Sequence, residues 1–465
     1  MDKTQQLGTA PIGKLLTQYS VPAIIAMIVN AIYNIVDRIF IGQYAGENAL
    51  AGLTVTFPMM MLIIAFASLI GSGSASIMAI KLGKKDKDGA SKTFGNALSL
   101  GVIVAFVLMA VCYPNMESLL TLLGSNASLL PYAASYMNIV LIGFIFQITS
   151  FVLSSTVRIE GYPMLSMVSM LVGAITNIAL DFVFIGIFGW GVQGAALATI
   201  TGQILGFIVL VSFYLRGKST LSITRQSFIP QLAEIKSIVS IGFTSFLSTI
   251  GASVASVFLN RALITYGGNA AITAMGAISS LSTLFVMPIL GIQQGMQPII
   301  GFNHGSKDKK RVNKTLLFGI SASTIFAVLV FIALQLFPET FMSMFLSKES
   351  STMSIAITGL RYSTIMLPLL SIGFIGTAYF QSIAKSKEAI ILGSLRQFIL
   401  LIPLVTILPS IFGLTGVWLA TPVADAITII ATAILLIKSV RQPYDSDSKT
   451  VKIEKDSDQA QLVTS

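Results

Sequence analysis

The sequence predicts an all-α polytopic membrane protein, and three observations carry that prediction. The 465-residue chain has a mean hydropathy of +0.84 and only 10% charged residues, whereas soluble domains carry about 25%. It contains roughly twelve apolar runs long enough to cross a bilayer, which takes about twenty helical residues each. Helices are expected because a lone helix satisfies its own backbone hydrogen bonds in lipid.

The expected spans fall into two halves of six. The runs of the first half are 16–41, 51–80, 94–113, 132–157, 163–186 and 191–215. Those of the second half are 237–264, 270–301, 315–337, 355–382, 388–411 and 414–437. We therefore expect two pseudo-symmetric six-helix lobes around a central cavity. The boundaries would be an amino-terminal lobe at 1–215, a cytoplasmic linker at 216–236, a carboxy-terminal lobe at 237–440 and a disordered tail at 441–465.

An internal repeat supports this division. Residues 46–53 resemble 268–275, residues 83–86 resemble 305–308, and residues 194–199 resemble 416–421. The members of each pair lie 222 residues apart. Because each half holds an even number of spans, the repeat should be parallel, with its axis along the membrane normal.

The charge distribution predicts the setting of the protein. A net charge of +10 would suggest a nucleic-acid partner in a soluble chain, but here the basic residues, Arg158 among them, lie in alternate loops. In the other loops, Lys348 is the only basic residue. This alternation follows the positive-inside rule. We therefore expect no nucleic-acid partner, a multi-pass membrane protein, and both termini in the cytoplasm. The single Cys112 allows no internal disulfide, and the polar start of the chain shows no cleavable signal.

Two carboxylates inside apolar runs are the main candidate functional residues. Asp37 follows Tyr33 and Asn34, and Asp181 follows Asn177, so each acid shares a helix face with a polar residue four positions earlier. Acids within a span are costly and by default mark ion paths or coupling sites. The structural alternatives are a packing pair between Asp37 and the arginine beside it, and an interfacial Asp181 that reaches water. Plain interhelical hydrogen bonding would explain the other polar residues.

Pro22 and a glutamine-rich stretch are weaker candidates. Pro22 costs little if it lies in the first turn of its helix, but it offers a bend point if the helix begins earlier. Gln293 and Gln297, with Met287 and Met296, could line a surface for apolar cations, or could equally pack helices together.

The second half shows a different set of charges. Arg261, Arg361 and Arg396 lie in or near its spans with no obvious acid beside them. Asp425 is its only candidate intramembrane acid, and His304, the single histidine, is expected to be solvated in a cytoplasmic loop. The two halves are therefore not expected to carry the same chemistry.

The sequence does not favour an enzyme. It contains no HExxH, Walker A, CxxC or kinase signature, and no cofactor is expected. An intramembrane serine–histidine dyad would need a histidine at depth, and none is present. Without a nucleotide-binding loop, transport would have to draw on an ion gradient.

The sequence resembles the multidrug and toxic compound extrusion (MATE) family over nearly its whole length. The resemblance rests on residues 20–22, 42–53, 82–86 and 191–199, together with the two six-helix halves. Within the family it is most similar to the DinF-like branch and to its MepA-like bacterial drug exporters. The resemblance implies a secondary active exporter of small organic cations or drugs, which exchanges them for H⁺ or Na⁺ by alternating access in a bacterial inner or plasma membrane. Because one chain would enclose a full cavity, we also expect a monomer.

The resemblance also implies roles for particular positions. Pro22 matches the bending proline of the first helix. The residues that match an amino-lobe cation site are Tyr33, Asp37, Asn177, Asp181 and Thr199, with Asn34 beside them. With Na⁺ as the coupling ion, Asp37 and Asp181 would be its metal ligands. The ranges 237–264 and 355–382 contain no acid, which argues against a second cation site in the other lobe.

Two other functions stay open at this point. A flippase for a lipid-linked precursor could use Arg38, Arg261 and Arg361 to bind phosphate, and a strongly basic cavity would favour it. A non-transporting receptor or structural protein would need no intramembrane carboxylate and would show no flux.

Overall fold

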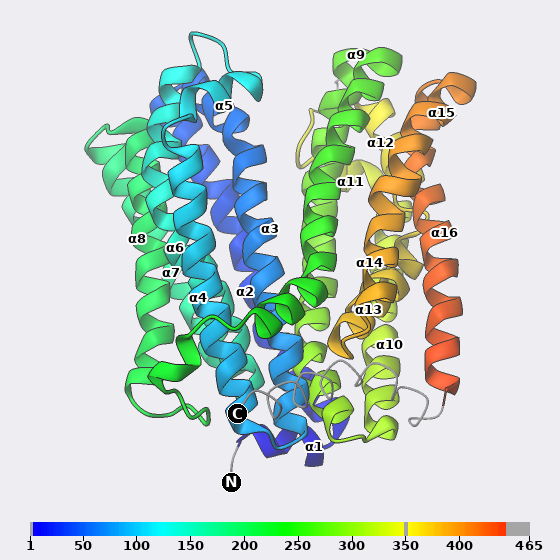
Figure 1. Ribbon diagram of the computed structural model, residues 1–465. Helices are drawn as coiled ribbons and strands as arrows, with labels where there is room; N and C mark the ends of the chain where they lie inside the picture. The colour runs from blue at the N-terminus through cyan, green and yellow to red at the C-terminus, as the bar shows by residue number, and fades with distance from the viewer. Residues whose placement is uncertain (1–2, 348–351, 443–465) are drawn as a thin grey trace.

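The computed structural model describes residues 3–347 and 352–442, so Lys348 and the expected tail beyond residue 442 lie outside the described residues. Figure 1 shows two helical bundles standing side by side, with the chain passing from the first to the second near the middle of the sequence. No strand occurs in the described part of the chain. The predicted all-α membrane fold with two lobes is confirmed.

The first bundle contains six long helices that match the six expected spans. They are α2 (Ile12–Phe40), α3 (Glu47–Gly83), α4 (Lys87–Cys112), α6 (Leu130–Ile159), α7 (Pro163–Asp181) and α8 (Gly191–Leu215). The short helices α1 (Gln6–Thr9) and α5 (Met116–Leu122) lie at opposite ends of the bundle (Figure 1). Side chains of α3, α4 and α6 form most of its apolar core.

The second bundle reaches the same number of spans by a less regular route. It consists of α9 (Leu232–Gly305), α10 (Lys309–Leu336), α11 (Pro338–Met342), α12 (Thr352–Ser363), α13 (Leu367–Ser382), α14 (Ser386–Ser394), α15 (Ile402–Phe412) and α16 (Leu414–Arg441). The 74-residue α9 is two spans joined without a loop, because Gly268, at φ +62°, breaks the helix. Helices α12 and α13 form one span bent by 51°.

The internal repeat is visible in the backbone. Gly46 and Gly268 both adopt positive φ at the turn between the first two spans of each half, as do Gly191 and Gly413 before the last span. Between the second and third spans, Asp86 and Asp308 each accept a hydrogen bond from the backbone N–H three residues later and so cap the next helix. All three pairs show the 222-residue offset.

The lobes approach most closely at one face, which we call the terminal face because α1 and the end of α16 lie there (Figure 1). A Cβ atom on Gly83 would overlap the carbonyl oxygen of Phe302, and one on Gly305 would overlap that of Ile80. Only glycine allows helices to pack at this distance. Toward the other face the two bundles diverge (Figure 1).

Two short segments cross between the lobes at the terminal face. The segment before the first lobe, residues 3–10, is held by the second lobe, because Arg311 Nη2 donates to the carbonyl oxygens of Leu7 (2.9 Å) and Ala10 (2.8 Å). The segment that enters the second lobe, residues 225–234, is held by the first lobe. There Lys81 pairs with Glu234 at 2.6 Å. We call these segments the amino strap and the linker strap.

Candidate functional site

Asp37 and Asp181 lie at the ends of two neighbouring helices of the first lobe. Asp37 is in the last turn of α2, and Asp181 is the last residue of α7. A π-helical turn follows each acid, over Ile41–Ala45 and Phe182–Ile187, and the two turns contact each other. Because π turns often occur at functional positions, both the acids and the backbone around them single out this place.

The polar residues near the two acids form one cluster. The carboxyl groups of Asp37 and Asp181 are within hydrogen-bonding range of each other. Asp181 is fully buried, and Asn177 nearly so. Asn177 Nδ2 donates to Thr199 Oγ1 at 3.4 Å, which brings α8 to the cluster. Tyr136 of α6, which the sequence did not single out, is buried beside Thr199 and the acids.

The two other predicted residues differ in their placement. Tyr33 lies one turn before Asp37 on α2 and is close to both acids. Asn34 is exposed, and its Nδ2 donates to the backbone oxygen of Asn30 in its own helix at 2.7 Å. The structure therefore brings five of the six predicted residues together and leaves Asn34 at the edge of the group, with its side chain beside Tyr33.

The cluster has more acceptors than donors. Oδ1 of Asp37, both carboxyl oxygens of Asp181 and Oδ1 of Asn177 are buried without a hydrogen-bond donor. Buried acceptors without a partner are costly, and two adjacent carboxylates resist joint ionisation. A proton shared between the acids, or a hard cation that prefers oxygen ligands, would satisfy these atoms.

The donor set limits how a metal ion could bind. The described residues contain no group of three or more His, Cys, Asp or Glu side chains that could hold one. A Na⁺ ion would therefore use Asp37 and Asp181 together with neutral oxygens such as those of Asn177 and Thr199. The residues fit a weakly bound monovalent cation better than a tightly held structural metal.

Pro22 lies in the interior of α2, not in its first turn. A proline in this position removes a backbone hydrogen bond and leaves a place where the helix can bend. On either side of it, Ser20 and Ile24 pack closely against Gly295 and Gly291 of α9. The bend point therefore faces the second lobe.

A cavity of about 470 Å³ lies between the lobes. Gln293 and Gln297 line it, as predicted for a cavity surface, but Met287 is not among the lining residues. Met296 is only 1% exposed and packs into an apolar core. Asp37 and Asp181 do not line the cavity either, so the acidic cluster and the cavity are separate places.

Hydrogen bonds between the lobes help to close this cavity. Gln381 Nε2 of the second lobe donates to Ser72 Oγ of the first at 3.1 Å and to Ser245 Oγ at 2.9 Å. Gln297 Nε2 donates to Ser76 Oγ at 3.1 Å. The bonds to Ser72 and Ser76 cross the interface, so they must break when the lobes separate there, whereas the bond to Ser245 stays within the second lobe.

The charges of the second lobe correct one expectation from the sequence. Arg396 is not without an acid: its Nε donates to Asp425 Oδ1 at 2.6 Å. The two residues lie on neighbouring helices, and both line the cavity. Their pairing depends on helix packing, which the sequence did not indicate.

Arg158 is a second residue whose place differs from the expectation. The sequence placed it among the basic loop residues, but it lies in the last turn of α6 and lines the cavity. Its guanidinium donates to the hydroxyl groups of Ser154, Ser155 and Ser166 at 2.8–3.0 Å. The signal that could have revealed it is the pair of serines three and four residues earlier, on the same helix face.

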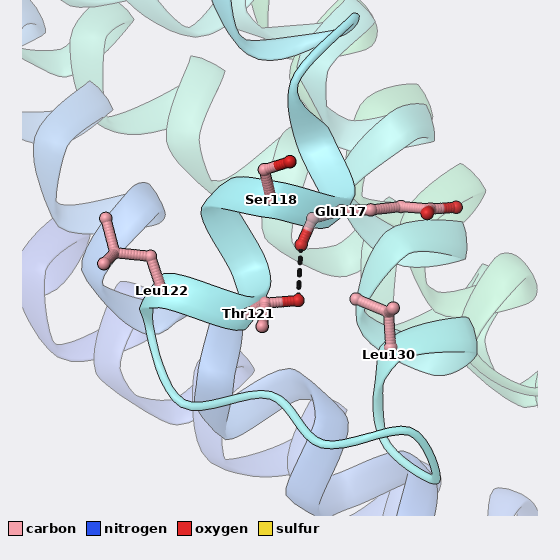
Figure 2. A pocket seen from close by; sticks show the side chains of 5 residues that line it. All are labelled: Glu117, Ser118, Thr121, Leu122 and Leu130. Atoms are coloured by element: carbon pink, nitrogen blue, oxygen red, sulfur yellow. Dashed lines mark hydrogen bonds between the residues drawn. The ribbon is translucent and has the colours of Figure 1, made fainter.

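A second depression lies on the surface at the face opposite the straps. Figure 2 shows it on α5 and the start of α6, with Thr121 bonded to the backbone oxygen of Glu117 at 2.8 Å. Leu122 and Leu130 also line it. It contains none of the predicted site residues.

Comparison with known proteins decides the family. The MatE family model matches residues 22–183 and 241–407, which is more than half of the chain and includes both acids. The chain belongs to the MatE family. It is thus a multi-pass membrane transporter of a multidrug efflux family.

Similar proteins are found among both curated sequences and solved structures. The chain is 28% identical to the multidrug export protein MepA of Staphylococcus saprophyticus, over 93% of this chain and 95% of the relative. It is 25% identical to MepA of Staphylococcus aureus, over 94% and 96%. A solved outward-facing multidrug resistance MATE transporter of the MOP superfamily is 27% identical, with a TM-score of 0.88 over 94% of this chain and 97% of that chain.

Proposed function

We propose that this MatE-family protein is a secondary active antiporter that exports small organic molecules in exchange for H⁺ or Na⁺ by alternating access. One observation carries the proposal: four buried acceptor oxygens of Asp37, Asp181 and Asn177 have no donor. A site of this kind is incomplete until a proton or a cation enters it. Ion entry and exit can therefore alternate with a change of conformation.

The mechanism links the cluster to the lobe interface through α2. The helix carries Asp37 near one end and Pro22 in its interior, where it packs on the second lobe. Binding of the cation removes the repulsion between the acids, and α2 can then bend at Pro22 and change the interface. Inward movement of one charge gains about 2.3 kcal/mol per 100 mV, which favours return of the loaded state.

The orientation follows from the basic loops. We assign the terminal face to the cytoplasm, so the lobes diverge toward the outside of the cell. In this state the cation would enter the cluster from outside, and the bound molecule would leave the cavity outward.

The test is ethidium efflux from vesicles that contain the purified protein, under an imposed pH gradient or an imposed Na⁺ gradient, never both. We expect efflux with one gradient, which names the ion, and background efflux from Asp37→Asn under either. The exposed Gln18→Ala is the matched control in the same helix and should transport normally. Equal, normal efflux by Asp37→Asn in folded protein would refute the coupling role.

A further inference from the structure

Arg158 carries hydrogen-bond donors that the protein leaves unused. A guanidinium has five N–H groups. Nη1 donates to Ser154 and Ser166, and Nη2 donates to Ser155. Nε and one N–H of Nη2 have no partner among the described residues. These two nitrogens lie on one edge of the planar group, so they can hold a carboxylate by two parallel hydrogen bonds.

The cavity around Arg158 does not neutralise its charge. Three charged residues line the cavity, namely Arg158, Arg396 and Asp425. Arg396 is neutralised by Asp425, but no acidic side chain of the described residues forms an ion pair with Arg158, whose partners are all serines. The lining thus holds one positive charge in excess, in a place where an unpaired charge is costly.

The opposite wall of the cavity has the complementary property. Oε1 of Gln293 and Oε1 of Gln397 are buried acceptors without a donor, and both residues line the cavity. Unpaired donors on the first lobe therefore face a cavity whose second-lobe wall has unpaired acceptors. A molecule with a carboxylate and an amine on one frame would satisfy both sets.

We propose that Arg158 is the anion-binding residue of the cavity and that the favoured substrates are zwitterionic amines with a carboxylate, rather than plain organic cations. The carboxylate binds the guanidinium edge, and the amine donates to the glutamine oxygens. This inference rests on the proposed export function, because it assigns the cavity to the transported molecule. The excess positive charge should weaken binding of molecules that carry only a cation.

The test uses two fluorescent dyes that differ only in the anionic group: a cationic rhodamine methyl ester and the zwitterionic rhodamine acid formed by its hydrolysis. Binding of each is measured by fluorescence polarisation to the full chain in lipid nanodiscs. The wild type should bind the acid more tightly than the ester. In Arg158→Gln the acid-to-ester affinity ratio should fall about tenfold, as expected for the loss of a charge-assisted bidentate contact.

Two further variants separate the role of the planar guanidinium edge from that of charge and folding. Arg158→Lys keeps the charge but loses this edge, so it should lower the acid-to-ester affinity ratio by an intermediate amount. Arg216→Gln changes an exposed arginine at the end of α8 and should leave the ratio unchanged. Thermal unfolding of each variant shows whether it is folded.

Three outcomes would overturn the proposal. One is a wild type that prefers the ester, and another is an Arg158→Gln ratio equal to that of the wild type. The third is displacement of the rhodamine acid by a soluble short-chain phosphatidic acid that binds more tightly, which would assign the same edge to a lipid phosphate. Failure of the export proposal is seen separately, as absence of efflux of both ethidium and the rhodamine acid under either gradient, while the binding ratio stays readable.

Discussion

The two lobes share a backbone plan but not their chemistry. Positions 222 residues after Asp37, Asn177 and Asp181 hold Leu259, Ile399 and Pro403. The polar cluster of the first lobe therefore has an apolar equivalent in the second. Thr199 is an exception, since Thr421 stands at the matching place.

The second lobe has its own buried acid, but it is neutralised internally. Asp425 is only 3% exposed and pairs with Arg396, whereas Asp37 and Asp181 have each other and acceptor atoms without donors. The comparison teaches that the repeat supplies helices and turns, while unequal side chains decide which lobe keeps buried acceptors without donors. Under the proposed mechanism, this lobe would respond to the gradient while the other provides most of the cavity wall.

The largest difference in gradient-driven efflux should be the one between Asp181→Asn and Asp425→Asn. Asp181→Asn removes the most buried acceptor pair of the cluster, so we expect gradient-driven efflux to fall by roughly 100-fold or more, to background. Efflux by Asp425→Asn, normalised to the amount of folded protein, should still depend on the ion gradient as it does in the wild type. Ion-dependent efflux lost in both variants would show that the coupling site extends into the second lobe.

The next effect concerns how much the Arg396–Asp425 pair contributes to the stability of the folded protein. Arg396→Gln or Asp425→Asn leaves one charge buried and unpaired, and we expect each to destabilise the protein by about 3–5 kcal/mol. The double variant leaves no charge and should recover much of that loss. Unfolding in detergent measures all three. A double variant as unstable as the sum of the singles would mean that the ions do not act as a pair.

A smaller effect should be the same in both lobes, because it concerns the shared backbone. Gly83→Ala and Gly305→Ala each insert a methyl group against a carbonyl oxygen of the other lobe. We expect each to weaken closure of the terminal face by about 1–3 kcal/mol. Spin labels on the exposed Lys84 and Ser306 would report a longer distance.

Gly276→Ala is the control for this pair, since a Cβ there meets nothing within 4 Å. It should leave the label distance unchanged. A longer label distance in Gly83→Ala but not in Gly305→Ala would show that the two glycine contacts do not contribute equally to the interface.

The smallest effect should come from Glu160, which follows α6 and has no acidic counterpart in the other lobe. Burial raises the pKa of the Glu160 carboxyl, although Ser219 Oγ and the Thr220 N–H, both at 2.7 Å, partly oppose this. The folded state therefore holds the proton more tightly than the unfolded state. Stability should fall as the pH rises from the ordinary glutamate pKa through the raised one.

Unfolding midpoints across this pH range would test that direction. Glu160→Gln should flatten the decrease by a few degrees, whereas the exposed Glu117→Gln should leave it in place. A wild-type protein that grows more stable with rising pH in this window would contradict the prediction.

The fold could be predicted well because apolar run length alone sets a span. The expected run 191–215 coincides with α8, and 163–186 differs little from α7 and its π turn. The direct passage through Gly268 could not be predicted, because a loop and a break of one residue look alike in sequence. The start of α2 at Ile12 was also missed, since its first turns pack on α9 and not on lipid.

The site was predictable to different degrees. The spacing of Asn177 and Asp181 placed them on one helix face, but their approach to Asp37 followed only from the family resemblance. The Arg396–Asp425 pair could not be recognised, because it depends on which helix faces meet at the cavity. For Arg158 the only local signal was the pair of serines on its own helix face. Contacts between distant segments are not visible in local periodicity.

The two straps have a mechanical consequence. The amino strap ties the beginning of the first lobe to the second through Arg311, and the linker strap ties the beginning of the second lobe to the first through Glu234. A separation at this face stretches both straps at once, so they resist as two springs in parallel. The stiffness of such springs adds, and the face should stay shut under small thermal fluctuations and open in a single concerted event.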